Sequence, residues 1–381
     1  MREKREAKYR VGVIGCGRAG TSRARAFDVH PLCKVVAIAD TDAENLTLGC
    51  RRFGVPGYAT YEEMLAREAI DIAMPVLPVR ANAGAVVAAA GAGAKAIFCE
   101  KPLTARLSEA DRMVESCQQR GVYLASGVMV SSHPDYRRAY ELAAGGEIGQ
   151  VERINLYGGN GQGGCHGLNL TRKFAAKAPA EWVVGRVGGD PHSDHEEPYE
   201  EGATGFGGVG GYIRFGNGIE CFSSFPGPTW RGIEVVGSEG LICNWNNTGL
   251  GLRLFKHSGR GAPLVEEEGV FEQYTEEERG YDDEGWQDPG PVMRAIVEDI
   301  VRVLEEGGDL AITSGDDLRH ALELAVALRE SHRQGGTRVS LPLADRSLVM
   351  YPEKSRWNYK KDLIGRAAYM AQMARQVEGS A

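Results

Sequence analysis

Short apolar runs alternate with longer amphipathic stretches over the first third of the chain. The stretches have apolar residues at helical spacing, and Gly54, Gly91 and Gly121 stand where helices are expected to end. The runs are rich in valine, isoleucine and alanine and predict strands at residues 10–15, 34–40, 69–77, 94–102 and 121–130. Regular alternation of strands and helices predicts a parallel, doubly wound α/β sheet.

The pattern changes after about residue 135. A helix is expected at 135–146 and a strand at 149–159, and the glycine-rich stretch that follows is expected to be irregular to about residue 205. Strands then come in near succession, at 207–217, 218–227, 230–240, 241–247 and 252–258. Strands without intervening helices predict a mainly antiparallel sheet.

Two helices with apolar residues at helical spacing follow at 291–308 and 315–336. We therefore expect an N-terminal Rossmann domain at 8–130 and an α+β domain with a large, open-faced, mainly antiparallel sheet at 131–345. A C-terminal extension at 346–381 is expected to be partly helical.

The open-faced sheet has a consequence for assembly. Apolar residues alternate along "GIECFSSF", and the predicted helices can cover one face of the sheet only. The other face then needs a partner, so we predict a homo-oligomer, a dimer or a tetramer.

Composition narrows the class of protein. The 381 residues suit two domains, and 43% hydrophobic with 25% charged residues is typical of a globular protein. A net charge of −8 without a basic face argues against nucleic acid, and no apolar run reaches the roughly 18 residues of a membrane span. The first residues lack the apolar core of a signal peptide, so a cytoplasmic location is expected. The eight cysteines form no Cys-x-x-Cys pair and are expected to be reduced thiols.

The first predicted strand ends in a glycine-rich turn. "GCGRAG" places Gly15, Gly17 and Gly20 as G-x-G-x-x-G between a strand and a helix, and Asp40 ends the second strand. This is a dinucleotide-binding pattern, in which the pyrophosphate meets the first N–H groups of the helix and the carboxylate accepts hydrogen bonds from the adenosine ribose. Because Asp40 would repel a 2′-phosphate, we predict NAD rather than NADP. The residues expected to bind it are Gly15, Cys16, Gly17, Arg18, Ala19, Gly20, Asp40, Leu77, Pro78, Asn82, Glu100 and Lys101.

"FCEKPL" closes the fifth predicted strand, and ligands of such sheets bind at the carboxyl ends of strands. With the glycine fingerprint and the later open sheet, this Glu-Lys-Pro resembles the Gfo/Idh/MocA family, the relatives of glucose–fructose oxidoreductase and inositol 2-dehydrogenase. The resemblance spans nearly the whole chain. It implies that Lys101 lies against the nicotinamide and the substrate.

The resemblance also draws attention to "GGNGQGGCHGLN", at 158–169. Family members usually have Gly-Gly followed by Asp-x-Gly-x-His here, and His166 matches the histidine while Gln162 replaces the aspartate. Asn169 stands where many members have a second Asp. Asn82 and Arg23 each replace a frequent histidine. Lys101, Gln162, His166 and Asn169 are the predicted substrate-binding residues.

Oxidation of a secondary alcohol needs a base for the hydroxyl proton and stabilisation of the charge at the developing carbonyl. His166 suits the base, Lys101 suits the stabiliser or relay, and Gln162 can orient His166 without supplying charge. We therefore expect His166 to titrate lower than in relatives that have the aspartate, unless another carboxylate lies near it. The predicted catalytic residues are Lys101, His166 and Gln162.

These observations predict an NAD-dependent oxidoreductase that acts on a secondary hydroxyl of a sugar, cyclitol or related polyol. One alternative is an NAD-dependent glycoside hydrolase that works by transient oxidation, elimination, water addition and re-reduction. A second is a non-catalytic NAD-binding regulator, in which Gln162 has disabled the chemistry. No metal is expected: the loop at 190–202, with two histidines, is interpreted as a lid or a solvated loop, and the acidic run at 265–290 as solvent-facing.

Overall fold

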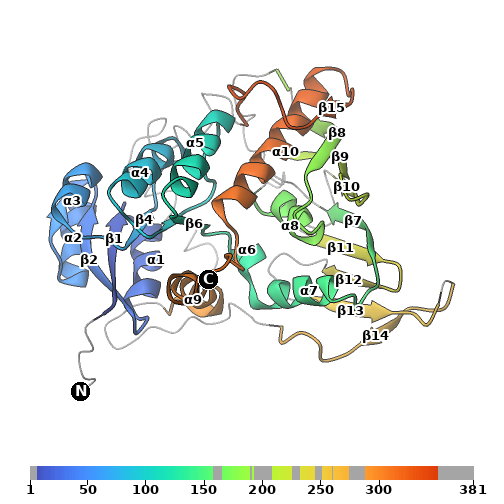
Figure 1. Cartoon of the computed structure of the whole chain (residues 1–381), viewed down its shortest axis with the longest axis horizontal. Coiled ribbons are helices and arrows are strands. Elements are labelled where there is room, and N and C mark those ends of the chain that lie inside the picture. The colour runs from blue at the N-terminus through green and yellow to red at the C-terminus, as the bar shows by residue number, and fades with distance from the viewer. Residues whose placement is uncertain are drawn as a thin grey trace, which may run out of the picture.

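The computed structural model describes residues 7–157, 165–188, 191–192, 208–224, 232–244, 251–259, 261–273 and 288–350. It contains two sheets, each with its own helices, that lie side by side in the view of Figure 1. The first third of the chain forms one sheet and the middle third forms most of the other. This is the predicted combination of a Rossmann sheet with an α+β domain.

The N-terminal sheet has six strands in the order β3-β2-β1-β4-β5-β6, and all its pairs are parallel. The five predicted strands are confirmed, and the two-residue β3 is an addition. The strands are β1 (Tyr9–Ile14), β2 (Cys33–Ala39), β3 (Gly57–Tyr58), β4 (Ile72–Pro75), β5 (Ala96–Cys99) and β6 (Tyr123–Ser126).

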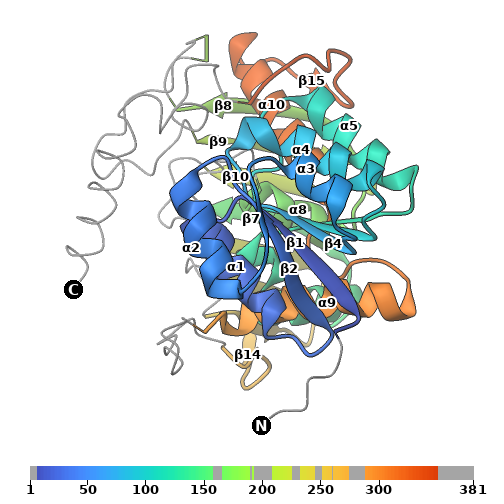
Figure 2. The same ribbon diagram turned by 90° about the vertical axis from the view of Figure 1, so that its left-hand side faces the viewer.

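Helices cover both faces of this sheet, as Figure 2 shows. On one face lie α1 (Arg18–Asp28) and α2 (Ala43–Phe53), and on the other α3 (Tyr61–Arg67), α4 (Val79–Gly91) and α5 (Leu107–Gln118). Gly54 ends α2 with a φ of 67°, a left-handed conformation that glycine adopts without strain. The doubly wound arrangement predicted from the alternation is therefore present.

A helix from late in the chain completes the first of these faces. Helix α9 (Gly290–Glu306) buries Val292, Ile296 and Ile300 in one hydrophobic core with Phe27 of α1 and Val13 of β1. This helix was predicted from the sequence, but it was assigned to the second domain at 131–345. In space it packs on the N-terminal sheet, about 160 residues after that sheet ends.

The second sheet has nine strands in the order β14-β13-β12-β11-β7-β10-β9-β8-β15. Every pair is antiparallel except β10 with β7, which confirms a mainly antiparallel sheet. The strands are β7 (Val151–Tyr157), β8 (Ala180–Val187), β9 (Val209–Phe215), β10 (Glu220–Ser224), β11 (Gly232–Gly237), β12 (Gly240–Asn244), β13 (Arg253–Lys256), β14 (Val265–Glu267) and β15 (Val339–Ser340).

The stretch expected to be irregular to about residue 205 contains regular structure, so that prediction is wrong for residues 167–174 and 180–187. Helix α8 (Gly167–Phe174) forms there, followed by β8. Burial alternates along β8, with Val183 and Val187 buried and Trp182 partly exposed. Alternation of buried and exposed side chains is typical of a half-buried strand. The glycines and short polar residues around this segment made the alternation hard to recognise in the sequence.

The remaining helices join the two sheets. Helix α6 (Met129–Ser132) follows β6 directly, α7 (Pro134–Ala144) leads to β7, and α10 (Gly315–Arg333) lies against β8, α5 and α8. A Cβ atom at Gly185 would lie 2.6 Å from the Cα atom of Leu328, so glycine is needed where β8 and α10 cross.

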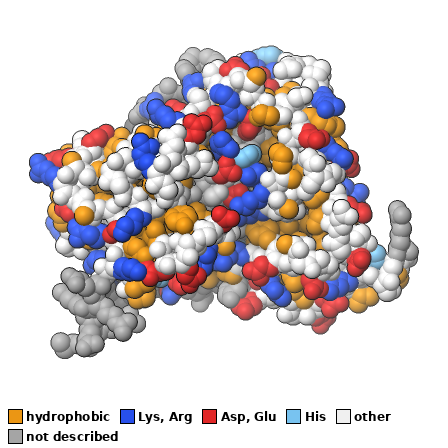
Figure 3. Space-filling model, viewed as in Figure 1, with side chains coloured by type: hydrophobic (Ala, Val, Ile, Leu, Met, Phe, Trp, Pro, Cys, Tyr) orange, Lys and Arg blue, Asp and Glu red, His pale blue; other side chains and the backbone are white. Residues whose placement is uncertain are grey.

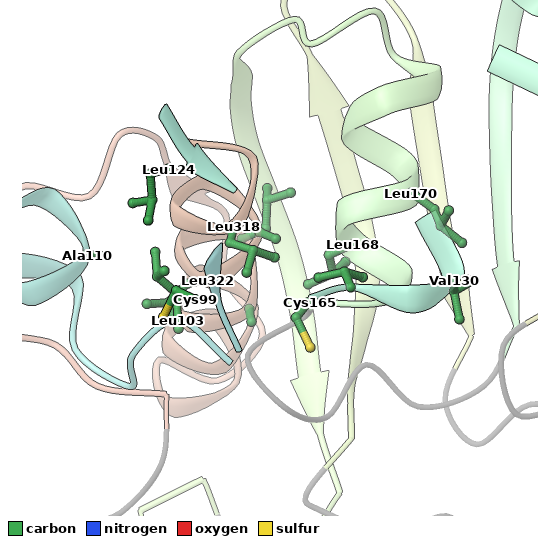
Figure 4. Close-up of a cluster of buried hydrophobic side chains, with 14 of the residues drawn as sticks. Cys99, Leu103, Ala110, Leu124, Val130, Cys165, Leu168, Leu170, Leu318 and Leu322 are labelled. Atoms are coloured by element: carbon green, nitrogen blue, oxygen red, sulfur yellow. The ribbon is translucent and has the colours of Figure 1, made fainter. Parts of the chain in front are cut away.

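Buried hydrophobic side chains fill the junction between the domains (Figure 4). Leu318 and Leu322 of α10 lie near Leu124 of β6 in this view, and Leu170 of α8 lies near Val130 of α6. All five are at most 6% exposed. The core therefore continues from the N-terminal sheet into the second domain without a polar gap at these positions.

The chain then returns from α10 across the N-terminal domain. The Arg346 guanidinium donates two hydrogen bonds of 2.7 Å to Asp111 on α5 and also pairs with Glu323 on α10. The backbone N–H of Met350 donates to the carbonyl of Ala105. Residues 346–350, the start of the predicted extension, thus tie α5 to α10.

One face of the second sheet lacks a helical cover among the described residues. Trp182 and Tyr212 have ring centroids 4.9 Å apart, Tyr212 and Phe222 5.2 Å apart, and Phe222 is 43% exposed. On the side of the molecule that Figure 3 shows, basic and acidic side chains are interspersed. No helix among the described residues is long and apolar enough to cross a membrane.

Candidate active site

The predicted cofactor residues gather at one edge of the N-terminal sheet. The register pairs Ile14 of β1 with Ala39 of β2 and with Pro75 of β4, and Cys99 of β5 pairs with Ser126 of β6. The segments that follow these strands therefore emerge side by side. This edge, where the carboxyl ends of parallel strands meet, is where such sheets bind ligands.

The glycine turn after β1 has the geometry expected of a phosphate-binding loop. Gly15 has a φ of +88°, and a Cβ atom there would lie 2.5 Å from the carbonyl oxygen of Val76. A Cβ atom at Gly20 would overlap the carbonyl oxygen of Gly15, so β1 and α1 pack closely only because both positions are glycine. At Gly17 the nearest atom to a Cβ would be 3.8 Å away, which leaves room on that side of the loop.

At the start of α1, no side chain of the helix's N-cap residue or first turn accepts hydrogen bonds from the first N–H groups, so these groups can bind an anion. Gly17 is the N-cap residue and offers no side-chain acceptor, and the first turn has no acidic residue. The N–H groups of Arg18, Ala19 and Gly20 therefore face no side-chain acceptor from the helix itself. A helix start with free N–H groups and the positive end of its dipole is suited to a pyrophosphate.

Asp40 is held at the end of β2 by the backbone. One carboxylate oxygen accepts from the N–H of Cys16 at 2.9 Å and the other from the N–H of Asp42 at 2.8 Å. Burial, together with the negative charge of Asp40, raises the pKa of the Cys16 thiol to about 12. Cys16 is therefore a neutral thiol beside a fixed carboxylate, and Asp40 has lone pairs left for ribose hydroxyls.

Asn82 donates hydrogen bonds to the turn Glu100–Lys101–Pro102, which follows β5. This residue, predicted to bind the cofactor, is 1% exposed, and its amide donates to the carbonyls of Pro102 at 3.1 Å and Leu103 at 3.2 Å. A longer contact of 3.4 Å reaches the carbonyl of Glu100. The contacts that the structure gives Asn82 thus hold the turn on which Lys101 lies.

Glu100 itself is paired with a residue that the sequence singled out without giving it a role. Arg23 of α1 donates from Nε to the Glu100 carboxylate at 3.2 Å, and both side chains are less than a fifth exposed. A Cβ atom at Gly127, after β6, would lie 2.8 Å from that carboxylate. Arg23 therefore pairs with Glu100 beside Lys101, a contact between residues 77 positions apart that the sequence does not indicate.

His166 and Asn169 lie at the start of α8. His166 is the N-cap residue, is 7% exposed and makes no side-chain capping bond to the helix. Asn169 is fully buried, and its amide donates to Ser131 Oγ at 2.8 Å and to Thr313 Oγ1 at 3.0 Å. The sequence did not single out Ser131 or Thr313, which come from distant parts of the chain.

Some predictions fall outside the described residues. Gln162 and the glycines at 158, 159 and 164 do so, as does most of the 190–202 loop and the part of the acidic run between 274 and 287. Over the described ranges, no three His, Cys, Asp or Glu side chains gather as metal ligands would. None of the eight cysteines, all of which lie within the described ranges, forms a disulfide bond.

Comparison with known protein families places the first domain. Residues 9–128 match the model of a family described as an oxidoreductase family with an NAD-binding Rossmann fold. The matched range runs from the start of β1 to just past β6, so it contains the glycine turn, Asp40 and the Lys101 turn.

Two characterised relatives are similar in sequence. A dTDP-3,4-didehydro-2,6-dideoxy-alpha-D-glucose 3-reductase of Streptomyces violaceoruber is 31% identical over 147 residues, which are 38% of this chain and 43% of that protein. A D-xylose 1-dehydrogenase (NADP(+)) of Haloferax volcanii is 36% identical over 145 residues, 38% of this chain and 43% of that protein. The chain thus matches less than half the length of these curated relatives.

A solved structure extends the likeness to the second domain. The WlbA dehydrogenase of Bordetella pertussis, in complex with NADH and UDP-GlcNAcA, superposes with a TM-score of 0.66 at 18% identity, over 89% of this chain and 99% of that one. At this identity the likeness concerns the fold. The likeness in fold therefore extends over both domains.

Proposed function

We propose that this protein, whose residues 9–128 match the model of an oxidoreductase family with an NAD-binding Rossmann fold, transfers a hydride between NAD and a secondary hydroxyl of a sugar, cyclitol or related polyol. The observation that carries the proposal is the meeting of the glycine turn, Asp40 and Lys101 at one edge of a parallel sheet. NAD accepts the hydride when it is bound. The chain supplies the groups that bind, orient and deprotonate the alcohol.

Each group has a role that its chemistry allows. The start of α1 binds the pyrophosphate, and Asp40 binds the adenosine ribose. Lys101, as an ammonium ion, stabilises negative charge on the alcohol oxygen as the hydroxyl proton leaves. His166 accepts that proton, and Gln162 orients the imidazole. Arg23, Glu100 and Asn82 keep the turn around Lys101 in place.

A panel of sugars, polyols and glycosides, assayed with NAD while NADH and product are both followed, tests this function. We expect NADH to accumulate in step with an oxidised product for at least one polyol. Release of an aglycone from a glycoside with no net NADH would instead indicate the hydrolase that works by transient oxidation. Binding of NAD without either reaction would indicate a regulator, and both of these results would contradict the proposal.

Cofactor preference provides the first variant test. We expect NAD to bind more tightly than NADP, because the fixed carboxylate of Asp40 would repel a 2′-phosphate. Asp40→Ser removes this repulsion. It should lower the ratio of the dissociation constant of NADP to that of NAD about tenfold or more, equivalent to about 1.4 kcal/mol. Isothermal titration calorimetry with each cofactor measures the ratio directly.

The control for this test is Glu44→Ser, which removes one exposed carboxylate from the first turn of α2. It changes the net charge equally and should leave the ratio unchanged within about twofold, because exposed charges are screened by salt. Tighter binding of NADP than NAD by the wild type would contradict the predicted preference.

Assembly is the second variant test. We propose that the uncovered face of the second sheet, with Trp182, Tyr212 and Phe222, is buried between copies of this chain. Phe222→Asp should lower the mass measured by sedimentation at micromolar concentration, because a carboxylate opposes burial of that face. Leu48→Asp, at an equally exposed position on α2, should leave the mass unchanged. A wild-type monomer at this concentration would refute the proposal.

A further inference from the structure

The feature that goes beyond the proposed function is a cluster of three buried polar side chains at the domain junction. Asn169 of α8 donates to Ser131 Oγ and Thr313 Oγ1, and those two hydroxyl oxygens lie 2.5 Å apart. All three residues are 0% exposed. We define these residues as the junction cluster.

Each member of the junction cluster belongs to a different structural unit. Ser131 lies on α6, which follows β6 directly. Thr313 lies just before α10, where its carbonyl accepts from the N–H of Ser126 and Ser314 forms an isolated bridge with Ala125. Thr313 therefore extends the hydrogen bonding of the N-terminal sheet beyond β6, while Asn169 belongs to the second domain.

This arrangement connects the two candidate catalytic residues through hydrogen bonds. Lys101 lies two residues after β5, whose last residue, Cys99, pairs with Ser126 of β6. Ser126 bonds to Thr313, and Thr313 bonds to Asn169, three residues after His166 on the same helix. One turn further along α8, Arg172 pairs with Asp317 at the start of α10. Helix α8 is thus held at two successive turns, by Thr313 beside the N-terminal sheet and by Asp317 of α10.

The junction cluster is not optimal for stability alone. The amide oxygen of Asn169 accepts no hydrogen bond from the described residues, and a buried acceptor without a donor costs free energy that an apolar side chain would avoid. Leu168 and Leu170, which precede and follow Asn169 on α8, are also fully buried. An amide at this position is therefore accounted for by the direction and length that its two hydrogen bonds impose on α8.

From these contacts we infer that Asn169 is a positioning residue, which sets the place of His166 relative to Lys101 through Ser131 and Thr313. This inference rests on the proposed function and differs from the sequence prediction that Asn169 binds substrate. Reacting groups lose about 10²-fold in rate when misplaced by roughly 1 Å. Loss of the junction cluster should therefore lower turnover while substrate and NAD still bind.

The decisive variants remove either the donor amide of Asn169 or the hydroxyl groups of Ser131 and Thr313 that accept its hydrogen bonds. Asn169→Ala, Ser131→Ala and Thr313→Val should each lower kcat about 10- to 100-fold, with KM and the dissociation constant of NAD changed less than about threefold. The double variant of Asn169→Ala with Thr313→Val should lose less than the product of the two single losses, because both substitutions remove the Asn169–Thr313 hydrogen bond. Asn169→Asp should recover most of kcat, since the two hydroxyls can donate to a carboxylate in the same place.

The matched control is Thr171→Val on the same helix. Thr171 is equally buried, but its hydroxyl donates to the carbonyl of Leu168 within α8. It should leave kcat within about twofold, and thermal unfolding should show all variants folded. Wild-type kcat in Asn169→Ala, or a loss confined to KM as expected of a substrate ligand, would overturn the inference.

A readout without substrate separates this inference from the proposed function. In protein labelled with ¹³C-histidine, the His166 signal, assigned with His166→Gln, should shift in Asn169→Ala and remain at its wild-type position in Thr171→Val. If no polyol is oxidised but this shift is seen, the proposed function fails and the positioning of His166 stands. An unchanged His166 signal in Asn169→Ala would reject the positioning role.

Discussion

Lys101→Ala is expected to lower turnover of the polyol substrate by about 10³-fold or more, since loss of one stabilising donor costs about 10²–10³-fold and loss of a proton relay adds to it. Lys101 follows β5 in a turn that Asn82, Arg23 and Gly127 hold in place. The turn that carries the ammonium group is therefore held before the substrate binds, which suits a transition state in which negative charge grows on oxygen. Affinity for NAD should change little, because the pyrophosphate binds at the start of α1. Stopped-flow or steady-state measurement of NADH, with calorimetry for NAD binding, gives both quantities.

Lys95→Ala is the matched control. Lys95 lies at the other end of the same strand, is 60% exposed and pairs with Asp71 at the surface. Its removal should change kcat less than about twofold, because exposed ion pairs contribute little. Full activity of Lys101→Ala would show that the turn after β5 serves only as structure.

His166→Ala is expected to lower kcat by about 10²–10⁴-fold, the range for loss of a general base. His166 makes no side-chain capping bond to α8, so its removal takes no capping hydrogen bond from the start of that helix. Added imidazole should restore part of the turnover, because it can accept the proton from solution. NAD affinity should equal that of the wild type.

His257→Ala, after β13 near the far edge of the second sheet, should behave as the wild type in the same assays. If His166→Ala retained wild-type kcat, His166 would have no part in the mechanism. The start of α8 would then be a glycine-rich turn with a structural histidine, and Lys101 would need another base beside it.

The N-terminal domain could be predicted because its signals are local. Strand and helix periodicities, the glycine spacing and the acid that ends β2 are all read within about 30 residues, the size of a βαβ unit. Gly20 is an example. Its spacing in the glycine motif predicts close packing of helix on strand, and in the structure this packing leaves no room for a Cβ atom at Gly20. The register of the parallel strands then brings Asp40 and Lys101 to one edge.

What could not be predicted depends on contacts between distant segments. Asn82 and Asn169 carry polar side chains that suggested ligand contacts, yet the described contacts of both lie with buried groups of the protein. Nothing near Asn169 in sequence indicates Thr313, 144 residues later. Glycines and short polar residues also concealed α8 and β8, although alternation along β8 was present.

Helix α9 limits how this protein can be divided. A fragment that ends after β6 would contain the whole matched family range but would leave Phe27 and the first sheet face without the side chains of Val292, Ile296 and Ile300. Such a fragment would expose a continuous apolar surface and tend to aggregate. A self-sufficient cofactor module would have to be discontinuous, with residues 288–314 joined to the end of β6. Recombination that exchanges second domains between relatives must therefore preserve three crossover points, after β6, before α9 and after residue 314, because β15 joins the second sheet from beyond α9.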